Sequence, residues 1–118
     1  MSNEHTLSDL LQSAIVKQAS DLHLSSGQSP LLRMDGEMVF IDMPALTEQQ
    51  LQNMLNGIMT SSQQEKFARE SDIDFAYAMT ENQRFRVNLY RQQRGSGAVF
   101  RVIPTHIPNM ESLSLPPV

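Results

Sequence analysis

One stretch of the chain, Gln83–Gln92, alternates strictly between apolar and polar residues, and this alternation constrains the fold more than any other feature. Successive side chains of a β-strand point to opposite faces, so the pattern predicts a strand with one buried and one open face. The buried face carries Phe85, Val87 and Leu89, and the open face carries Arg84, Arg86, Asn88 and Tyr90. A lone strand is unstable, so the rest of the chain must complete a sheet and cover its apolar side.

The next segment predicts the partner of this strand. Residues 98–103 are rich in Val, Phe and Ile, which favour strands. Between the two segments lies Arg94-Gly95-Ser96-Gly97, whose glycines and serine are typical of a turn. The two segments are therefore expected to pair antiparallel as the last two strands of the sheet.

The remaining patterns predict further strands and three helices, and so an α+β fold. Strands are expected at Asp21–Ser25, Leu31–Met34, 37–41 and 73–77, with Asp35-Gly36 as a two-residue type I′ turn. Helices are expected at 6–18, capped by Thr6, at 47–59, with Thr47 and Gln50 as a capping box, and from Ser61 or Ser62 to Ser71. The apolar stripe of the first helix should lie on the sheet.

Length and composition fit a single soluble domain. The chain has 118 residues, of which 40% are hydrophobic and 19% are charged, close to ordinary globular usage. It has no cysteine, which excludes disulfides, thiolate metal ligands and a cysteine nucleophile. Residues 1–11 do not have the pattern of a secretory signal, and no apolar run approaches the roughly 18 residues of a membrane helix, so a cytoplasmic location is expected.

The distribution of charge singles out the last two predicted strands. The net charge of −4 argues against a nucleic-acid partner, yet no Asp or Glu occurs between Asn82 and Met110. The arginines in this interval are Arg84, Arg86, Arg91, Arg94 and Arg101. Arginine matches phosphate and carboxylate oxygens bidentately, so arginines that face one way on adjacent strands can clamp an anion. The residues alone favour a plainer interpretation, a solvated face whose arginines pair with acids elsewhere in the fold, such as Asp72 and Asp74.

Other candidate sites have less support. The glycines of Arg94-Gly95-Ser96-Gly97 suggest a phosphate loop, but the chain lacks the G-x-x-x-x-G-K-[ST] motif, so an ordinary hairpin turn is favoured. The three histidines share no ligand spacing, so no metal site is predicted, and His23 is expected to face outward from its strand. No nucleophile accompanies Asp72 and Asp74, so no catalytic residue is predicted in this chain.

Several motifs occur in the order found in one family. They are Ala19-Ser20-Asp21-Leu22-His23-Leu24 with Gly27, Arg33-Met34-Asp35-Gly36, Asp72-Ile73-Asp74-Phe75, Arg84-Phe85-Arg86-Val87-Asn88, and Arg94-Gly95-Ser96-Gly97-Ala98-Val99-Phe100-Arg101 ending in Ile103-Pro104. Together they resemble the N-terminal domain of PilT-like type IV pilus retraction ATPases. The resemblance spans nearly the whole chain.

This resemblance implies a PAS-like antiparallel sheet with helices packed on one side, over residues 1–103. Residues 104–118, rich in proline, would begin an extended linker to a RecA-like ATPase domain. In such hexameric motors ATP and Mg²⁺ bind between the two domains and beside a neighbouring subunit. The positions that match phosphate-contacting arginines are Arg86 and Arg101, with Arg84 and Arg94 as further candidates.

The resemblance also implies partners and limits. The expected partners are the RecA-like domain, neighbouring subunits and an inner-membrane pilus platform protein, and the expected location is cytoplasmic, peripheral to that membrane. The chain lacks a Walker A motif, so this chain alone should bind no cofactor and should not hydrolyse ATP. Two questions stay open. The first is whether the chain resembles the retraction motor itself or its accessory paralogue. The second is whether the domain is instead a protein-interaction or small-ligand-sensing module without a nucleotide role.

Overall fold

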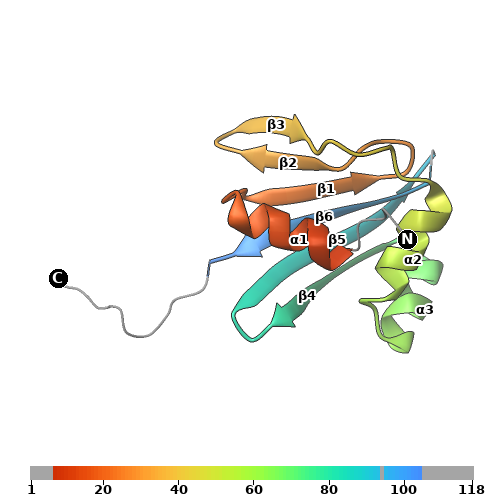
Figure 1. Cartoon of the computed structure of the whole chain (residues 1–118). Helices are drawn as coiled ribbons and strands as arrows, with labels where there is room; N and C mark the ends of the chain where they lie inside the picture. Colours follow the sequence, from red (N-terminus) through yellow and green to blue (C-terminus); the bar gives the residue numbers. More distant parts are fainter. Residues whose placement is uncertain (1–6, 94, 105–118) are drawn as a thin grey trace, which may run out of the picture.

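The computed structural model describes residues 7–93 and 95–104, which form a six-stranded antiparallel sheet and three helices (Figure 1). The strands lie in the order β3-β2-β1-β6-β5-β4. Their bounds are β1 (Asp21–Ser25), β2 (Leu31–Met34), β3 (Glu37–Phe40), β4 (Asp72–Thr80), β5 (Gln83–Gln92) and β6 (Gly95–Ile103), and the helices are α1 (Leu7–Val16), α2 (Glu48–Asn56) and α3 (Ser61–Glu70). The predicted α+β fold with an antiparallel sheet is confirmed.

Local signals account for most of the element ends. Asp35 and Gly36 have φ angles of 53° and 84°, as a type I′ turn requires, and they join β2 to β3. Thr47 and Gln50 form the capping box of α2. Ser71 ends α3 in the left-handed conformation with its N–H donating to the Phe67 carbonyl.

Several predicted boundaries were wrong by a few residues. The cap of α3 is Thr60, which pairs with Gln63 in a second capping box, rather than Ser61 or Ser62. Strand β6 begins at Gly95 because Gly95, Ser96 and Gly97 already pair with β5, so the turn is shorter than expected. Strand β4 extends to Thr80. The cap expected at Thr6, residue 94 and the linker expected after Pro104 lie outside the described residues.

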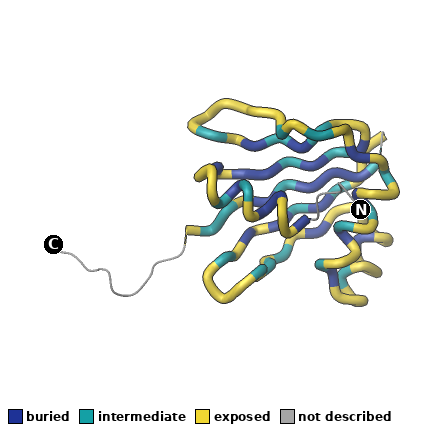
Figure 2. The backbone as a smooth tube through the Cα atoms, in the orientation of Figure 1, coloured by how far each residue is buried: buried dark blue, intermediate teal, exposed yellow. Residues whose placement is uncertain are grey.

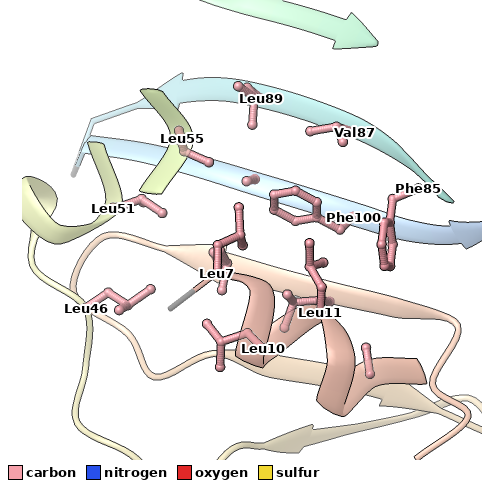
Figure 3. Close-up of a cluster of buried hydrophobic side chains, with 14 of the residues drawn as sticks. Leu7, Leu10, Leu11, Leu46, Leu51, Leu55, Phe85, Val87, Leu89 and Phe100 are labelled. Carbon is pink, nitrogen blue, oxygen red and sulfur yellow. The ribbon is translucent and has the colours of Figure 1, made fainter. Parts of the chain in front are cut away.

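The core lies between the helices and one face of the sheet. Side chains of α1 and α2 meet those of β5 and β6 around Phe85 and Phe100 (Figure 3). Both phenylalanines are 0% exposed, and truncating such a side chain to alanine costs about 3 to 5 kcal/mol. Buried residues concentrate on the central strands β1 and β6 (Figure 2). The alternation of β5 therefore places Arg84 and Arg86 on the face that none of the described helices covers, which we call the open face.

The first edge of the sheet is unlike the rest. All four residues of β3 are exposed, and three of them are the large apolar residues Met38, Val39 and Phe40. Phe40 is 62% exposed. No helix in the described part of the chain is long and apolar enough to span a membrane.

Candidate anion-binding site

The strand register sets the arginines of the open face in one line. Arg86 of β5 lies opposite Arg101 of β6, Arg101 lies opposite Asp21 of β1, and Asp21 lies opposite Arg33 of β2. We call these four residues the arginine row. Directly opposite positions on neighbouring strands hold their Cβ atoms about 5 Å apart. The row thus holds three arginines and one acid, and among the described residues only Arg101 lies within ion-pair distance of Asp21.

Asp21 is the acid that anchors this row. Its Oδ2 lies 3.5 Å from Nε of Arg101. Its Oδ1 accepts a hydrogen bond of 2.6 Å from the Ser20 hydroxyl. The Asp21 side chain is 8% exposed, whereas that of Arg101 is 72% exposed. One end of the ion pair is thus fixed in the sheet, while the guanidinium reaches into solvent.

A shallow hollow of about 230 Å³ lies beside this ion pair. It is lined by Asp74, Arg86, Val87, Asn88, Val99 and Arg101. The two guanidinium groups supply fixed positive charge, and Arg86 has no ion pair among the described residues. Guanidinium groups on adjacent strands can donate hydrogen bonds to the oxygens of a phosphate or carboxylate. The two guanidinium groups make this hollow the candidate site for an anion, although Asp74 also lines it.

In the described part of the chain Asp72 and Asp74 form no ion pair with the arginines, so that expectation was wrong. Their carboxylates instead accept hydrogen bonds of 3.1 and 3.0 Å from the Asn88 side-chain amide. The register explains the difference, because β4 places Ala76 opposite Arg86, and Asp74 opposite Asn88. The plainer interpretation therefore holds for Arg101, which pairs with Asp21, but not for Arg86, which has no ion pair among the described residues.

The other arginines of the segment have separate positions. Arg84 is exposed on the open face, where it lies opposite Ala78 and Ile103, one row away from Arg86. Arg91 points toward the helix side, with its guanidinium carbon 4.9 Å from the centre of the Phe67 ring, and so is not part of the hollow. Arg94 lies outside the described residues.

The glycine-rich segment is held by an acid of this chain. Glu48, at the start of α2, accepts a hydrogen bond of 2.9 Å from the Ser96 N–H and one of 3.0 Å from the Ser96 hydroxyl. Burial raises the pKa of Glu48, but hydrogen bonds from Gln52, Ser96 and Ser26 outweigh it and bring the pKa below its usual value. The Ser96 amide is thus already bonded to a carboxylate, which agrees with a hairpin rather than a phosphate loop.

His23 lies on the open face as expected, but it is half-buried rather than solvated. Burial lowers its pKa, opposed by the charge of Asp21 and assisted by that of Arg33. Its Nε2 is buried and makes no hydrogen bond among the described residues. The neutral ring adds no charge to the arginine row at neutral pH.

Sequence reasoning missed Asp21, Ser20 and Glu48 as parts of these contacts. The alternation of Asp21–Ser25 places Asp21 on a strand, but nothing in it says which strand lies alongside. Among residues 7–93 and 95–104, no group of three or more His, Cys, Asp or Glu side chains is arranged to hold a metal ion. The described residues thus offer contacts for an anion and no metal centre.

The chain is similar to known proteins over most of its length. No protein-family model matches the chain. Over 109 residues it is 38% identical to a Pseudomonas aeruginosa protein described as the type IV pilus retractation ATPase PilT, an alignment that covers 92% of the chain and 32% of that relative. A crystal structure of the pilus retraction motor PilT with bound ADP superposes with a TM-score of 0.80 at 32% identity, over 96% of the chain and 33% of that structure.

The chain is homologous to the N-terminal domain of PilT-like ATPases. The six-stranded sheet and three helices match that PilT domain. A second P. aeruginosa relative, described as the type IV pilus ATPase PilU, is 31% identical over 109 residues, 92% of the chain and 28% of the relative. The chain spans about a third of the length of these PilT-like relatives.

Proposed function

We propose that this domain is the nucleotide-contacting N-terminal part of a type IV pilus retraction motor. ATP would bind between the domain and a RecA-like ATPase domain that follows it in sequence, with Arg86 and Arg101 contacting the phosphate oxygens. The observation that carries the proposal is the pairing of these two exposed guanidinium groups across β5 and β6, beside the hollow. Arg84 and Arg94 would make further contacts with the nucleotide phosphates.

The chemistry of phosphoryl transfer supports this assignment. Negative charge spreads over the oxygens of the transferring group, and a fixed guanidinium stabilises it without any proton transfer. The phosphate cradle and the Mg²⁺ site would come from the ATPase domain, because this chain contains no G-x-x-x-x-G-K-[ST] motif. The domain therefore contributes charge and contacts, and hydrolysis is expected only from the full-length protein.

The assembly forms part of the same proposal. The full-length protein would form a hexameric ring in which this PAS-like domain contacts neighbouring subunits, and an inner-membrane pilus platform protein would be its partner. Its location would be cytoplasmic, peripheral to that membrane. The similarity to proteins described as PilT and as a pilus retraction motor supports these statements.

The test is alanine substitution of each arginine in the full-length protein. Arg86→Ala and Arg101→Ala should each lower kcat for ATP hydrolysis by at least about tenfold, because each removes a charge-assisted contact to a phosphoryl oxygen. Arg69→Ala is the matched control, since Arg69 is exposed on α3 and pairs only with Glu70 among the described residues. Wild-type turnover in both test variants, with all three proteins folded, would refute the assignment.

A second candidate function has one observation in its favour. The exposed apolar residues of β3 suit a protein-interaction module that has no nucleotide role. In that case Phe40→Ser would abolish twitching motility while Arg86→Ala and Arg101→Ala would not change ATP hydrolysis. The opposite pattern favours the nucleotide-contacting role.

A further inference from the structure

Asp21 is a charged residue held in a buried position, and its surroundings fix it on several sides. Its neighbour Ser20 donates its backbone N–H to the Arg33 carbonyl and accepts from the Val102 N–H, each at 2.9 Å. The Ser20 hydroxyl binds one carboxylate oxygen at 2.6 Å. The second oxygen therefore has a fixed position from which to hold Arg101.

The contact between the two side chains leaves most of the guanidinium free. The ion pair joins Asp21 to Nε of Arg101, and in the described part of the chain Arg101 has no other ion pair. A guanidinium has five N–H donors in a planar fork, of which Nε carries one. The terminal nitrogens thus remain available for a second, bidentate partner.

Asp21 also offsets repulsion within the arginine row. Arg86 and Arg101 lie directly opposite each other, and like charges in that relation are destabilising. Asp21 lies on the far side of Arg101, opposite it on β1. It can restrain Arg101 in this position without neutralising Arg86.

We propose that Asp21 is a positioning residue that holds Arg101 by Nε, so that its terminal nitrogens, together with Arg86, meet the oxygens of a nucleotide phosphate. This inference rests on the proposed function. Asp21 does not touch the nucleotide itself. Its effect on binding is transmitted through Arg101 alone.

The experiment is a double-mutant cycle on the full-length protein, read as the Kd for a non-hydrolysable ATP analogue with Mg²⁺. Arg101→Ala should raise the Kd about tenfold, as the loss of a charge-assisted contact predicts. Asp21→Asn keeps the shape and the Ser20 contact but removes the charge, and should raise the Kd about threefold. The double variant should match Arg101→Ala, because coupled residues are not additive.

The Kd separates positioning from a purely structural role. Loss of folded protein lowers the number of binding sites but leaves the Kd of each remaining site unchanged. Asp42→Asn is the control, since Asp42 is exposed in the loop after β3, away from the arginine row, and should bind as wild type. If Asp21→Asn does not fold, Ser20→Ala replaces it in the cycle. Ser20→Ala should raise the Kd about twofold when Arg101 is present, and should not change the Kd when it is combined with Arg101→Ala.

The possible results distinguish the two proposals. An unchanged Kd and kcat in both Arg86→Ala and Arg101→Ala would overturn the proposed function and this inference with it, and an unchanged Kd in Arg101→Ala alone would overturn this inference. If Arg101→Ala binds the ATP analogue more weakly but Asp21→Asn binds it as the wild type does, this inference alone is overturned. A double variant that binds more weakly than Arg101→Ala would do the same, because Asp21 would then act by another route.

Discussion

Glu48 and Asp21 are carboxylates held by neighbouring side chains, and each restrains a different part of β6. Asp21 contacts Arg101 near the end of the strand. Glu48 binds Ser96 at its beginning, and Gln52 donates a hydrogen bond of 2.7 Å to the same carboxylate. The two acids thus fix β6 at both ends from different elements.

Replacing Glu48 by glutamine should make stability less dependent on pH. The folded-state pKa of Glu48 lies below its ordinary value of 4.5, so its contribution is present above that pH and is lost as the pH falls through the folded pKa. At pH 7 Glu48→Gln should lower the free energy of unfolding by about 1.5 to 3 kcal/mol, the range for hydrogen bonds to a charged group. Urea unfolding of both 118-residue chains from pH 7 to pH 3 provides the measurement.

Glu65→Gln is the control for this experiment. Glu65 is exposed on α3 and makes no side-chain hydrogen bond within the described residues, so its substitution should change the unfolding free energy by less than about 0.5 kcal/mol. A gap between wild type and Glu48→Gln that stays constant down to pH 3 would contradict the role given to the Glu48 charge.

For single residues, the sequence predicted which arginines face solvent but not which acids pair with them. Alternation alone places Arg84 and Arg86 on the open face, because the period of a strand is two. The partner of Arg101 depends on β1 lying beside β6, a pairing between segments about 80 residues apart. Asp72 and Asp74 do lie on the strand next to β5, but the register brings them to the side chain of Asn88 and not to the arginines.

Among the elements, the β5–β6 hairpin depends on a close contact between Tyr90 and Gly97. The two residues lie opposite each other, and a Cβ at Gly97 would overlap the Tyr90 ring, with the phenolic oxygen 2.7 Å away. An aromatic ring that covers a glycine on the neighbouring strand compensates for the missing side chain. Glycine is required here by space.

Gly97→Ala and Gly57→Ala should therefore change stability in opposite directions. Gly97→Ala forces the ring of Tyr90 to move and should cost about 1 to 3 kcal/mol. Gly57 follows α2 with φ at −69°, and a Cβ there would meet Met54 O at an ordinary 3.4 Å. Gly57→Ala should stabilise the chain by about 0.4 to 1 kcal/mol through the unfolded state.

The measurement is the thermal or urea unfolding midpoint of the two variants against wild type. Tyr90→Ala combined with Gly97→Ala supplies a further control, because it removes the overlapping ring and should make the alanine at 97 less costly than it is beside Tyr90. Equal destabilisation by Gly97→Ala in both backgrounds would show that the ring is not the cause.

Turns and helix ends could be predicted where the residues that determine them are close together in the sequence. The Asp35-Gly36 turn and the Thr47 capping box each involve residues within three positions of one another, and both are present. The sequence predicted a later start for β6, because Gly95 and Gly97 are typical of a turn. Pairing with β5 and the contact of Glu48 hold Gly95 and Ser96 in the sheet instead.

For the molecule as a whole, the sheet has a protected centre and a bare edge. Strand β6 is hydrogen-bonded to β1 and β5, and six of its residues form a buried or half-buried run from Gly95 to Phe100. Among the described residues, strand β3 pairs only with β2, and all four residues of β3 are exposed. Local opening should therefore be far easier at β3 than at β6.

Hydrogen exchange should show this gradient. Amides of β6 should exchange at least about a hundredfold more slowly than those of Met38 and Phe40 in the 118-residue chain, because the edge strand opens without disturbing the core. Amide exchange followed by NMR gives the rates residue by residue. Slow exchange across β3 would mean that another chain covers this edge in solution.

The central position of β6 also has a mechanical meaning. Arg101 lies two residues before the end of β6 at Ile103, and Pro104 follows directly. Tension applied to the chain after Pro104 along the strand axis would load the hydrogen bonds to β1 and β5 together, in shear, rather than unzip them one at a time. Pulling on this end would therefore shift the arginine row as a rigid part of the sheet instead of unravelling the strand that carries it.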